Sequence, residues 1–172
     1  MVATPHVLGI TGWKNSGKTT LTERLVSELT RRGYAVSTVK HAHHDFDIDQ
    51  PGTDSFRHRT AGAREVAIVS DRRWALMHEL RGEDEPPLAA VLARLSPCDL
   101  VLVEGYKREA HRKIEVRRLA AKDTAPRTAV DPAIVAVAAD HAITGERVPV
   151  FSLDDIDAIA GFVETLLGLK QS

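Results

Sequence analysis

The sequence predicts an α/β protein: a three-layer fold with a mostly parallel β-sheet covered by helices on both faces. Short apolar runs rich in β-branched residues alternate along the chain with segments of helical periodicity. Strands that are apolar at almost every position are typical of parallel sheets buried on both sides. The chain has 172 residues, 43% hydrophobic and 27% charged, which suits one core. We therefore predict a single domain over residues 1–172.

Eight segments are predicted as strands because they are short, rich in β-branched residues and bounded by polar or turn residues. Six are expected in the sheet: residues 7–11, 35–39, 65–69, 100–103, 134–139 and 148–151. The other two, 72–80 and 112–119, are expected at the sheet edge or in a hairpin. The second lies in a stretch, 107–127, that is a candidate edge hairpin or dimerisation element.

The clearest helix begins after Gly17. Leu21, Leu25 and Leu29 recur at intervals of four residues, and Gly33 follows where a helix would end. Three more helices are predicted, within 53–62, from 88 to 95 and from about 152 to 167.

The chain is nearly neutral, so its overall electric field would not hold it to nucleic acid or to an anionic membrane. Lys and Arg number 23 and Asp and Glu 24, for a net charge of -1. The only cysteine, Cys98, cannot form an internal disulfide. No segment approaches the roughly 18 apolar residues of a membrane-spanning helix. We therefore expect a cytoplasmic protein without nucleic-acid or membrane partners.

The strongest functional motif is the phosphate-binding loop (P-loop) GWKNSGKT at residues 12–19, a full match to G-x-x-x-x-G-K-[ST]. It stands between a predicted strand and a predicted helix, as the motif requires. The backbone N–H groups of such a loop form a nest for phosphates, and the helix dipole adds positive potential. Lys18 would contact the β- and γ-phosphates and Thr19 would bind Mg²⁺. The predicted phosphate-binding residues are Gly12, Trp13, Lys14, Asn15, Ser16, Gly17, Lys18 and Thr19.

A P-loop site also needs a carboxylate near the metal. Glu104 closes the apolar run 100–103 and would emerge at the carboxyl end of a buried strand, where parallel sheets bind their ligands. There it would hold Mg²⁺, directly or through water, or orient an attacking water. Lys18 and Glu104 are therefore the predicted catalytic residues. An acid that only caps the strand end is the alternative.

Residues 40–49, KHAHHDFDID, hold three histidines and three aspartates. One interpretation is a switch-like loop in which Lys40 and His41 lie near the phosphates and an aspartate, for which we choose Asp49, assists the metal. A second is a transition-metal site, since imidazoles and carboxylates suit Zn²⁺ or Ni²⁺. A polar surface loop is the third, and the residues leave all three open.

Three segments, in this order and spacing, resemble the signatures of the MobB family of molybdopterin-guanine dinucleotide biosynthesis adapter proteins: GWKNSGKTTL, KHAHHDFDIDQPGTDSFRHRTAGA and DLVLVEGYK. The resemblance implies a P-loop protein that binds GTP, hydrolyses it weakly and is usually a homodimer. It also implies a partner, the guanylyltransferase MobA, which joins GMP from GTP to the molybdenum-bearing pterin, and contact with molybdopterin-bearing proteins. By resemblance the triphosphate cradle extends to Thr20, and residues 40–54 form a mobile loop.

No motif identifies the base. Asn15 is the only asparagine, so the N-K-x-D guanine signature is absent. Asp140, at the end of the predicted strand 134–139, is our candidate to accept hydrogen bonds from guanine N1 and N2, and a turn aspartate is the alternative. Lys14 lies one residue away from the signature lysine of related dimeric ATPases, so we assign it no role across a dimer interface.

Residues 107–127 contain eight Lys or Arg and three Asp or Glu, a local charge of +5. This segment is either a surface for the phosphorylated pterin, GTP or an acidic partner, or a solvated basic hairpin.

Two other functions stay open. A small-molecule kinase would use Asp45, Asp47 or Glu104 as base. A metal-delivery GTPase would use the cluster His41, His43 and His44.

Overall fold

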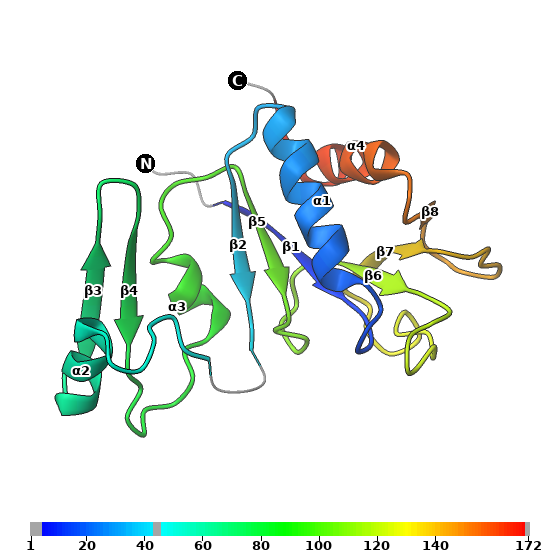
Figure 1. Ribbon diagram of the computed structural model, residues 1–172. Coiled ribbons are helices and arrows are strands. Elements are labelled where there is room, and N and C mark those ends of the chain that lie inside the picture. The colour runs from blue at the N-terminus through cyan, green and yellow to red at the C-terminus, as the bar shows by residue number, and fades with distance from the viewer. Residues whose placement is uncertain (1–4, 43–45, 171–172) are drawn as a thin grey trace. The chain divides into compact units, whose positions relative to one another are not determined.

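The computed structural model describes residues 5–42 and 46–170, and the chain divides into two compact units. The first unit comprises residues 1–41 and 94–172, and the second comprises residues 42–93. Figure 1 labels the elements of both units. Within the described residues, no helix is long and apolar enough to cross a membrane.

The first unit is built on a six-stranded sheet in the order β2-β5-β1-β6-β7-β8, and every neighbouring pair is parallel. Its strands are β1 (His6–Thr11), β2 (Val36–Lys40), β5 (Leu100–Glu104), β6 (Lys113–Arg117), β7 (Ile134–Ala139) and β8 (Val150–Ser152). Its helices are α1 (Lys18–Arg31) and α4 (Ile156–Leu167). The predicted α/β fold with a mostly parallel sheet is confirmed.

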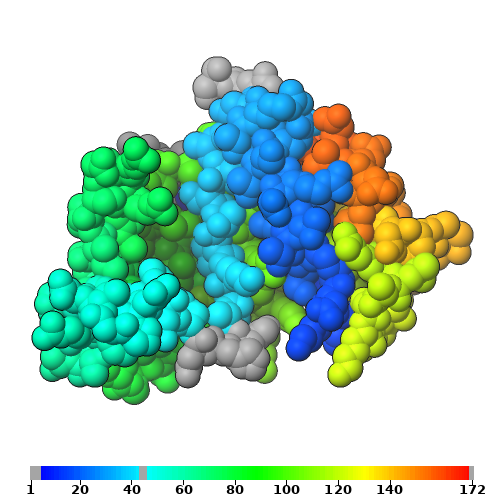
Figure 2. All heavy atoms as spheres, in the orientation of Figure 1, coloured from blue at the N-terminus to red at the C-terminus, as the bar shows by residue number. Residues whose placement is uncertain are grey.

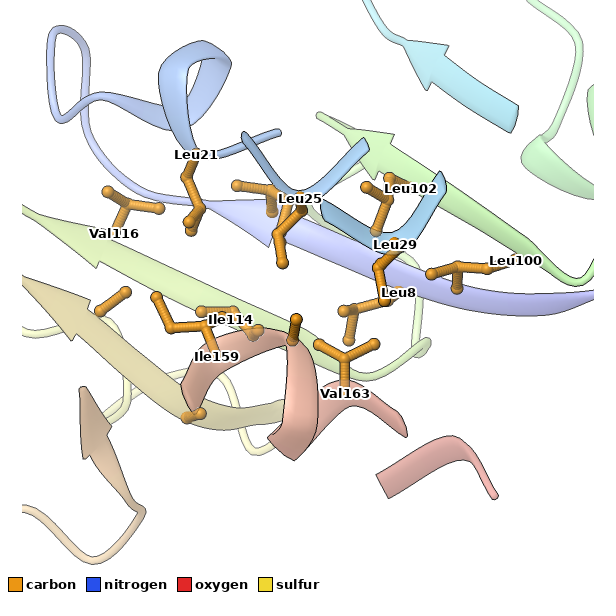
Figure 3. Packing of buried hydrophobic residues seen from close by; sticks show 14 of the residues in the cluster. Leu8, Leu21, Leu25, Leu29, Leu100, Leu102, Ile114, Val116, Ile159 and Val163 are labelled. Atoms are coloured by element: carbon orange, nitrogen blue, oxygen red, sulfur yellow. The ribbon is translucent and has the colours of Figure 1, made fainter. Parts of the chain in front are cut away.

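The main core lies between one face of this sheet and the two helices, which pack against each other (Figure 3). Side chains alternate between the faces of a strand, so Leu8 and Ile10 of β1 point to the helices. The helices contribute Leu21, Leu25 and Leu29 from α1, and Ile159, Ala160 and Val163 from α4. The leucine spacing that predicted α1 therefore marks its buried face.

The second face of the sheet carries buried charges. Lys113, Glu115 and Arg117 of β6 are all at least nine-tenths buried. Arg117 donates to Glu115 at 2.7 Å and also pairs with Glu146. Loop backbone completes the network, because the Glu115 carboxylate accepts from the N–H groups of residues 127 and 128. Buried carboxylates need such donors, and the N–H groups in the interior of a helix are already bonded to the carbonyl oxygens of that helix. Among the described residues of the first unit, both helices, α1 and α4, lie on the first face of the sheet.

β6 lies inside the sheet, parallel to both β1 and β7. The edge position predicted for residues 112–119 is therefore wrong. Charged residues alternate with Ile114 and Val116 along this strand, a pattern typical of a strand with one face in water. Pairing of those charges with buried partners allows the same pattern in the interior of the sheet.

The second unit contains the antiparallel hairpin of β3 (Glu65–Val69) and β4 (Trp74–His78), with α2 (Asp54–Ala61) and α3 (Leu88–Leu92). Thr53 caps α2 by accepting a hydrogen bond from the N–H of Phe56. The strand predicted over 72–80 is confirmed as a hairpin strand. The run 65–69, expected in the main sheet, instead pairs with β4 in a sheet of its own.

The fully buried Leu25 tests the contribution of the α1 core. Replacing Leu25 by Ala removes apolar contacts and leaves a cavity, so the free energy of unfolding in urea should fall by about 2–5 kcal/mol. Leu119, which is 68% exposed, provides the control, because Leu119→Ala should change that free energy by about 0.5 kcal/mol or less. Equal losses for both variants would contradict the assigned core.

Candidate functional site

The P-loop of residues 12–19 leaves β1 and enters α1 through a backbone that requires glycine. Gly12 has φ 146° and Gly17 has φ 91°. A Cβ atom on Gly12 would lie 2.5 Å from Ser16 Oγ and 2.6 Å from the carbonyl oxygen of Val116. The loop is therefore packed against the end of β6 so closely that no side chain fits at residue 12.

The structure brings together two of the three predicted metal-binding residues, Thr19 and Glu104. Thr19 Oγ1 lies 3.2 Å from each carboxylate oxygen of Glu104 and donates a hydrogen bond to it. Glu104 ends β5, which pairs in parallel with β1, so both side chains lie at the carboxyl edge of the sheet. A hydroxyl and a carboxylate are oxygen donors of the kind that Mg²⁺ prefers, so the described residues fit this ion.

Lys18 crosses the loop, and its Nζ donates to the carbonyl oxygen of Trp13 at 2.8 Å. Burial lowers the pKa of Lys18 below the usual value for lysine, Glu104 opposes this shift, and Lys107, Arg127 and Lys40 add to it. More positive than negative groups therefore act on the Lys18 ammonium. Such a site favours a multiply charged anion.

Lys40 and His41 lie at the same edge of the sheet. Lys40 is the register partner of Glu104, and the His41 N–H donates to the Glu104 carbonyl oxygen at 2.8 Å. The His41 ring stacks on Tyr106 with 4.7 Å between centroids. The remaining members of the predicted cluster, His43 and His44, lie outside the described residues, as does Asp45.

Asp49 belongs to the second unit, where its buried carboxylate accepts a hydrogen bond from Arg59 of α2 at 2.8 Å. Arg59 also pairs with Asp47 at 2.9 Å. Both aspartates thus serve an ion-pair network that joins the chain before α2 to that helix. The metal role of Asp49 stays a prediction. Over residues 5–42 and 46–170, no group of three or more His, Cys, Asp or Glu is placed to hold a metal ion.

Asp140 follows β7 and connects the ends of two strands. Its Oδ1 accepts from the N–H of Leu119, just beyond β6, at 3.1 Å, and contacts Nδ1 of His141 at 2.8 Å. The hydrogen bond with His141 is the main cause that lowers the pKa of Asp140. Asp140 is therefore a fixed, ionised acceptor at the edge where β1 and β5 also end, and its part in reading guanine stays a prediction.

The segment after β6 is bonded to the P-loop through contacts that no sequence motif marks. Trp13 Nε1 donates to the Ala125 carbonyl oxygen at 2.8 Å, and the Arg127 guanidinium lies 5.2 Å from the Trp13 ring centroid. A groove of about 460 Å³ opens here, lined by Trp13, Lys14, Lys122, Asp123 and Thr124. The +5 charge left a ligand-binding surface and a solvated hairpin both open, and only the fold shows that this segment adjoins the phosphate loop.

Residues 7–140 match the family model described as MobB, molybdopterin guanine dinucleotide synthesis protein B. The chain belongs to the MobB family. MobB relatives named molybdopterin-guanine dinucleotide biosynthesis adapter protein come from Escherichia coli K12 and Haemophilus influenzae, each 38% identical to this chain. The alignments cover 91% and 94% of this chain, and 90% and 89% of the relatives.

A solved MobB structure supports the same assignment. The crystal structure of the MobB protein homolog from Bacillus stearothermophilus superposes with a TM-score of 0.70 at 32% identity, over 95% of this chain and 99% of that one. The resemblance and the P-loop type of α/β fold are thereby confirmed.

Two glycines distinguish crowding at the MobB P-loop from simple backbone strain. Gly12 and Gly33 both have positive φ, but a Cβ on Gly33 would meet no atom within 4 Å. Gly33→Ala should therefore lower the free energy of unfolding by about 1 kcal/mol, from the dihedral alone. Gly12→Ala adds a collision with Ser16 and should cost at least about 1 kcal/mol more. Equal losses in urea titrations would show that the loop is not tightly packed.

Proposed function

We propose that this MobB chain binds GTP with Mg²⁺ at the P-loop and assists a MobA-type guanylyltransferase in forming molybdopterin-guanine dinucleotide. The observation that carries the proposal is the contact of Thr19 with Glu104 beside a complete P-loop motif. The names of the curated relatives, adapter proteins of this biosynthesis, supply the pathway.

Each residue has a defined part in the proposal. The N–H groups at the start of α1 receive the phosphates, and the Lys18 ammonium exchanges the Trp13 carbonyl oxygen for phosphate oxygens. Thr19 and Glu104 hold Mg²⁺, directly or through water, and the ion neutralises phosphate charge when it is bound. Lys18 and Glu104 are the catalytic residues of a slow hydrolysis. An adapter that presents GTP to a partner does not require fast turnover.

The finer parts of the proposal concern the base, the assembly and the compartment. Asp140 accepts hydrogen bonds from guanine N1 and N2, supported by its position at the end of β7 and its fixed carboxylate. The active form is a homodimer. The reaction takes place in the cytoplasm, and the single cysteine, Cys98, forms no internal disulfide that would call for an oxidising compartment.

Calorimetric titration in the presence of Mg²⁺ tests nucleotide binding. Wild-type protein should bind GTP and bind ATP distinctly more weakly. Lys18→Ala removes the ammonium that faces the phosphates and should weaken GTP binding at least about a hundredfold, with an unchanged circular dichroism spectrum. Lys170→Ala, at an exposed lysine beyond α4, is the matched control and should bind as the wild type does. Equal affinity for ATP would refute guanine specificity.

A reconstituted guanylylation assay tests the adapter role. With a MobA-type enzyme, GTP and the molybdenum-bearing pterin present, wild-type protein should raise the rate of dinucleotide formation. Lys18→Ala should give no increase, because the adapter then presents no GTP, and Lys170→Ala should act as the wild type does. Full stimulation by folded Lys18→Ala would show that nucleotide binding to this chain plays no part.

A further inference from the structure

Two arginines of the segment after β6 reach the P-loop from outside the motif. Arg118 lies against the start of α1: its Nε is 2.7 Å, and its Cζ 2.9 Å, from the position that a Cβ on Gly17 would occupy. Arg127 lies over the Trp13 ring and acts electrostatically on Lys18. Figure 2 shows this segment, in yellow-green, on the surface beside the dark blue P-loop.

The side chains of these two arginines have no acidic partner within the described part of the chain. The buried Nε atoms of both lack a hydrogen-bond acceptor there. The Nε atom of Arg117, the residue before Arg118, has no acceptor either, so the contrast lies in charge: Glu115 and Glu146 neutralise Arg117 on the second face of the sheet. Strand alternation sends Arg118 in the opposite direction, toward the P-loop.

A partly buried guanidinium without a counter-charge costs free energy. A protein that maintains two of them beside a lysine must recover that free energy in another interaction. Lys40 and Lys107 also act electrostatically on Lys18, and Glu104 is the acid that acts on Lys18 most strongly. The Glu104 carboxylate is in turn engaged by Thr19. The site therefore has an excess of cations whose natural complement is a polyphosphate.

We propose that Arg118 and Arg127 form a clamp on the polyphosphate chain of the bound nucleotide, supplied by this chain itself from the segment after β6. The inference rests on the proposed function, since it assigns two further ligand-binding residues to the same site. Arginine suits this role because its planar group donates two parallel hydrogen bonds to phosphate oxygens. The clamp recognises the charge of the phosphates and does not distinguish between bases.

Titrations with Mg-GTP, Mg-GDP and inorganic tripolyphosphate test the clamp. Arg118→Gln and Arg127→Gln should each lower the affinity for GTP and the affinity for tripolyphosphate by a similar factor of about ten, because each removes a charge-assisted contact. The affinity for GDP, which has one phosphate fewer, should fall by a smaller factor. Arg127→Lys keeps the charge and should recover part of the affinity. Arg108→Gln, at an exposed arginine of the same stretch, is the matched control and should bind within about twofold of wild type.

The outcomes separate the clamp from the proposed function. If both glutamine variants bind like Arg108→Gln while wild-type protein prefers GTP, the clamp is overturned and the function stands. If wild-type protein binds ATP and GTP equally but both variants bind tripolyphosphate more weakly, the clamp stands and guanine specificity is refuted. Losses of GTP affinity without losses of tripolyphosphate affinity would also overturn the clamp, because the arginines would then act on the nucleoside.

Discussion

The parallel pairing of β1 with both β5 and β6 is the constraint on which the candidate site depends. Ile10 is in register with Glu104 on one side, and Thr11 is in register with Glu115 on the other. The P-loop therefore emerges between an acid that contacts Thr19 and a basic segment that follows β6. Because all three strands run in the same direction, their carboxyl ends meet at one edge, and no single element has to carry the whole site.

The buried charges on the second face of the sheet give the segment after β6 a defined conformation. The Glu115 carboxylate accepts from the backbone N–H groups of Arg127 and Thr128, and Lys113 pairs with Asp131 at 3.0 Å. A loop held by its backbone in this way can aim the Arg127 side chain at Trp13. The network thus positions the loop, a function that better explains its burial than any net gain in stability, since desolvation offsets much of the attraction between buried charges.

The sequence was sufficient to predict the elements whose signal is local. The leucine spacing located α1, the G-x-x-x-x-G-K-[ST] match located the P-loop, and the apolar run before Glu104 located the end of β5. These features need only the chain around them. Their meeting at one edge followed from the parallel sheet, which the alternation of strands and helices predicted.

Features that depend on distant partners could not be predicted in this way. Residues 65–69 are as apolar as a central strand, and only the pairing with β4 shows that they leave the main sheet. The charges of β6 resembled a solvated edge because their counter-charges, Asp131 and Glu146, lie far along the chain. For the same reason, the basic count of residues 107–127 did not separate neutralised Arg117 from Arg118.

The contacts of Trp13 connect the phosphate loop to the charged network. Its indole N–H is bonded to Ala125, and its ring supports Arg127, whose backbone N–H is bonded to Glu115. A ligand that shifts the P-loop must therefore move this segment with it or break these bonds. In the proposed function, phosphate oxygens compete with the Trp13 carbonyl oxygen for Lys18, at the residue where the loop and the segment meet.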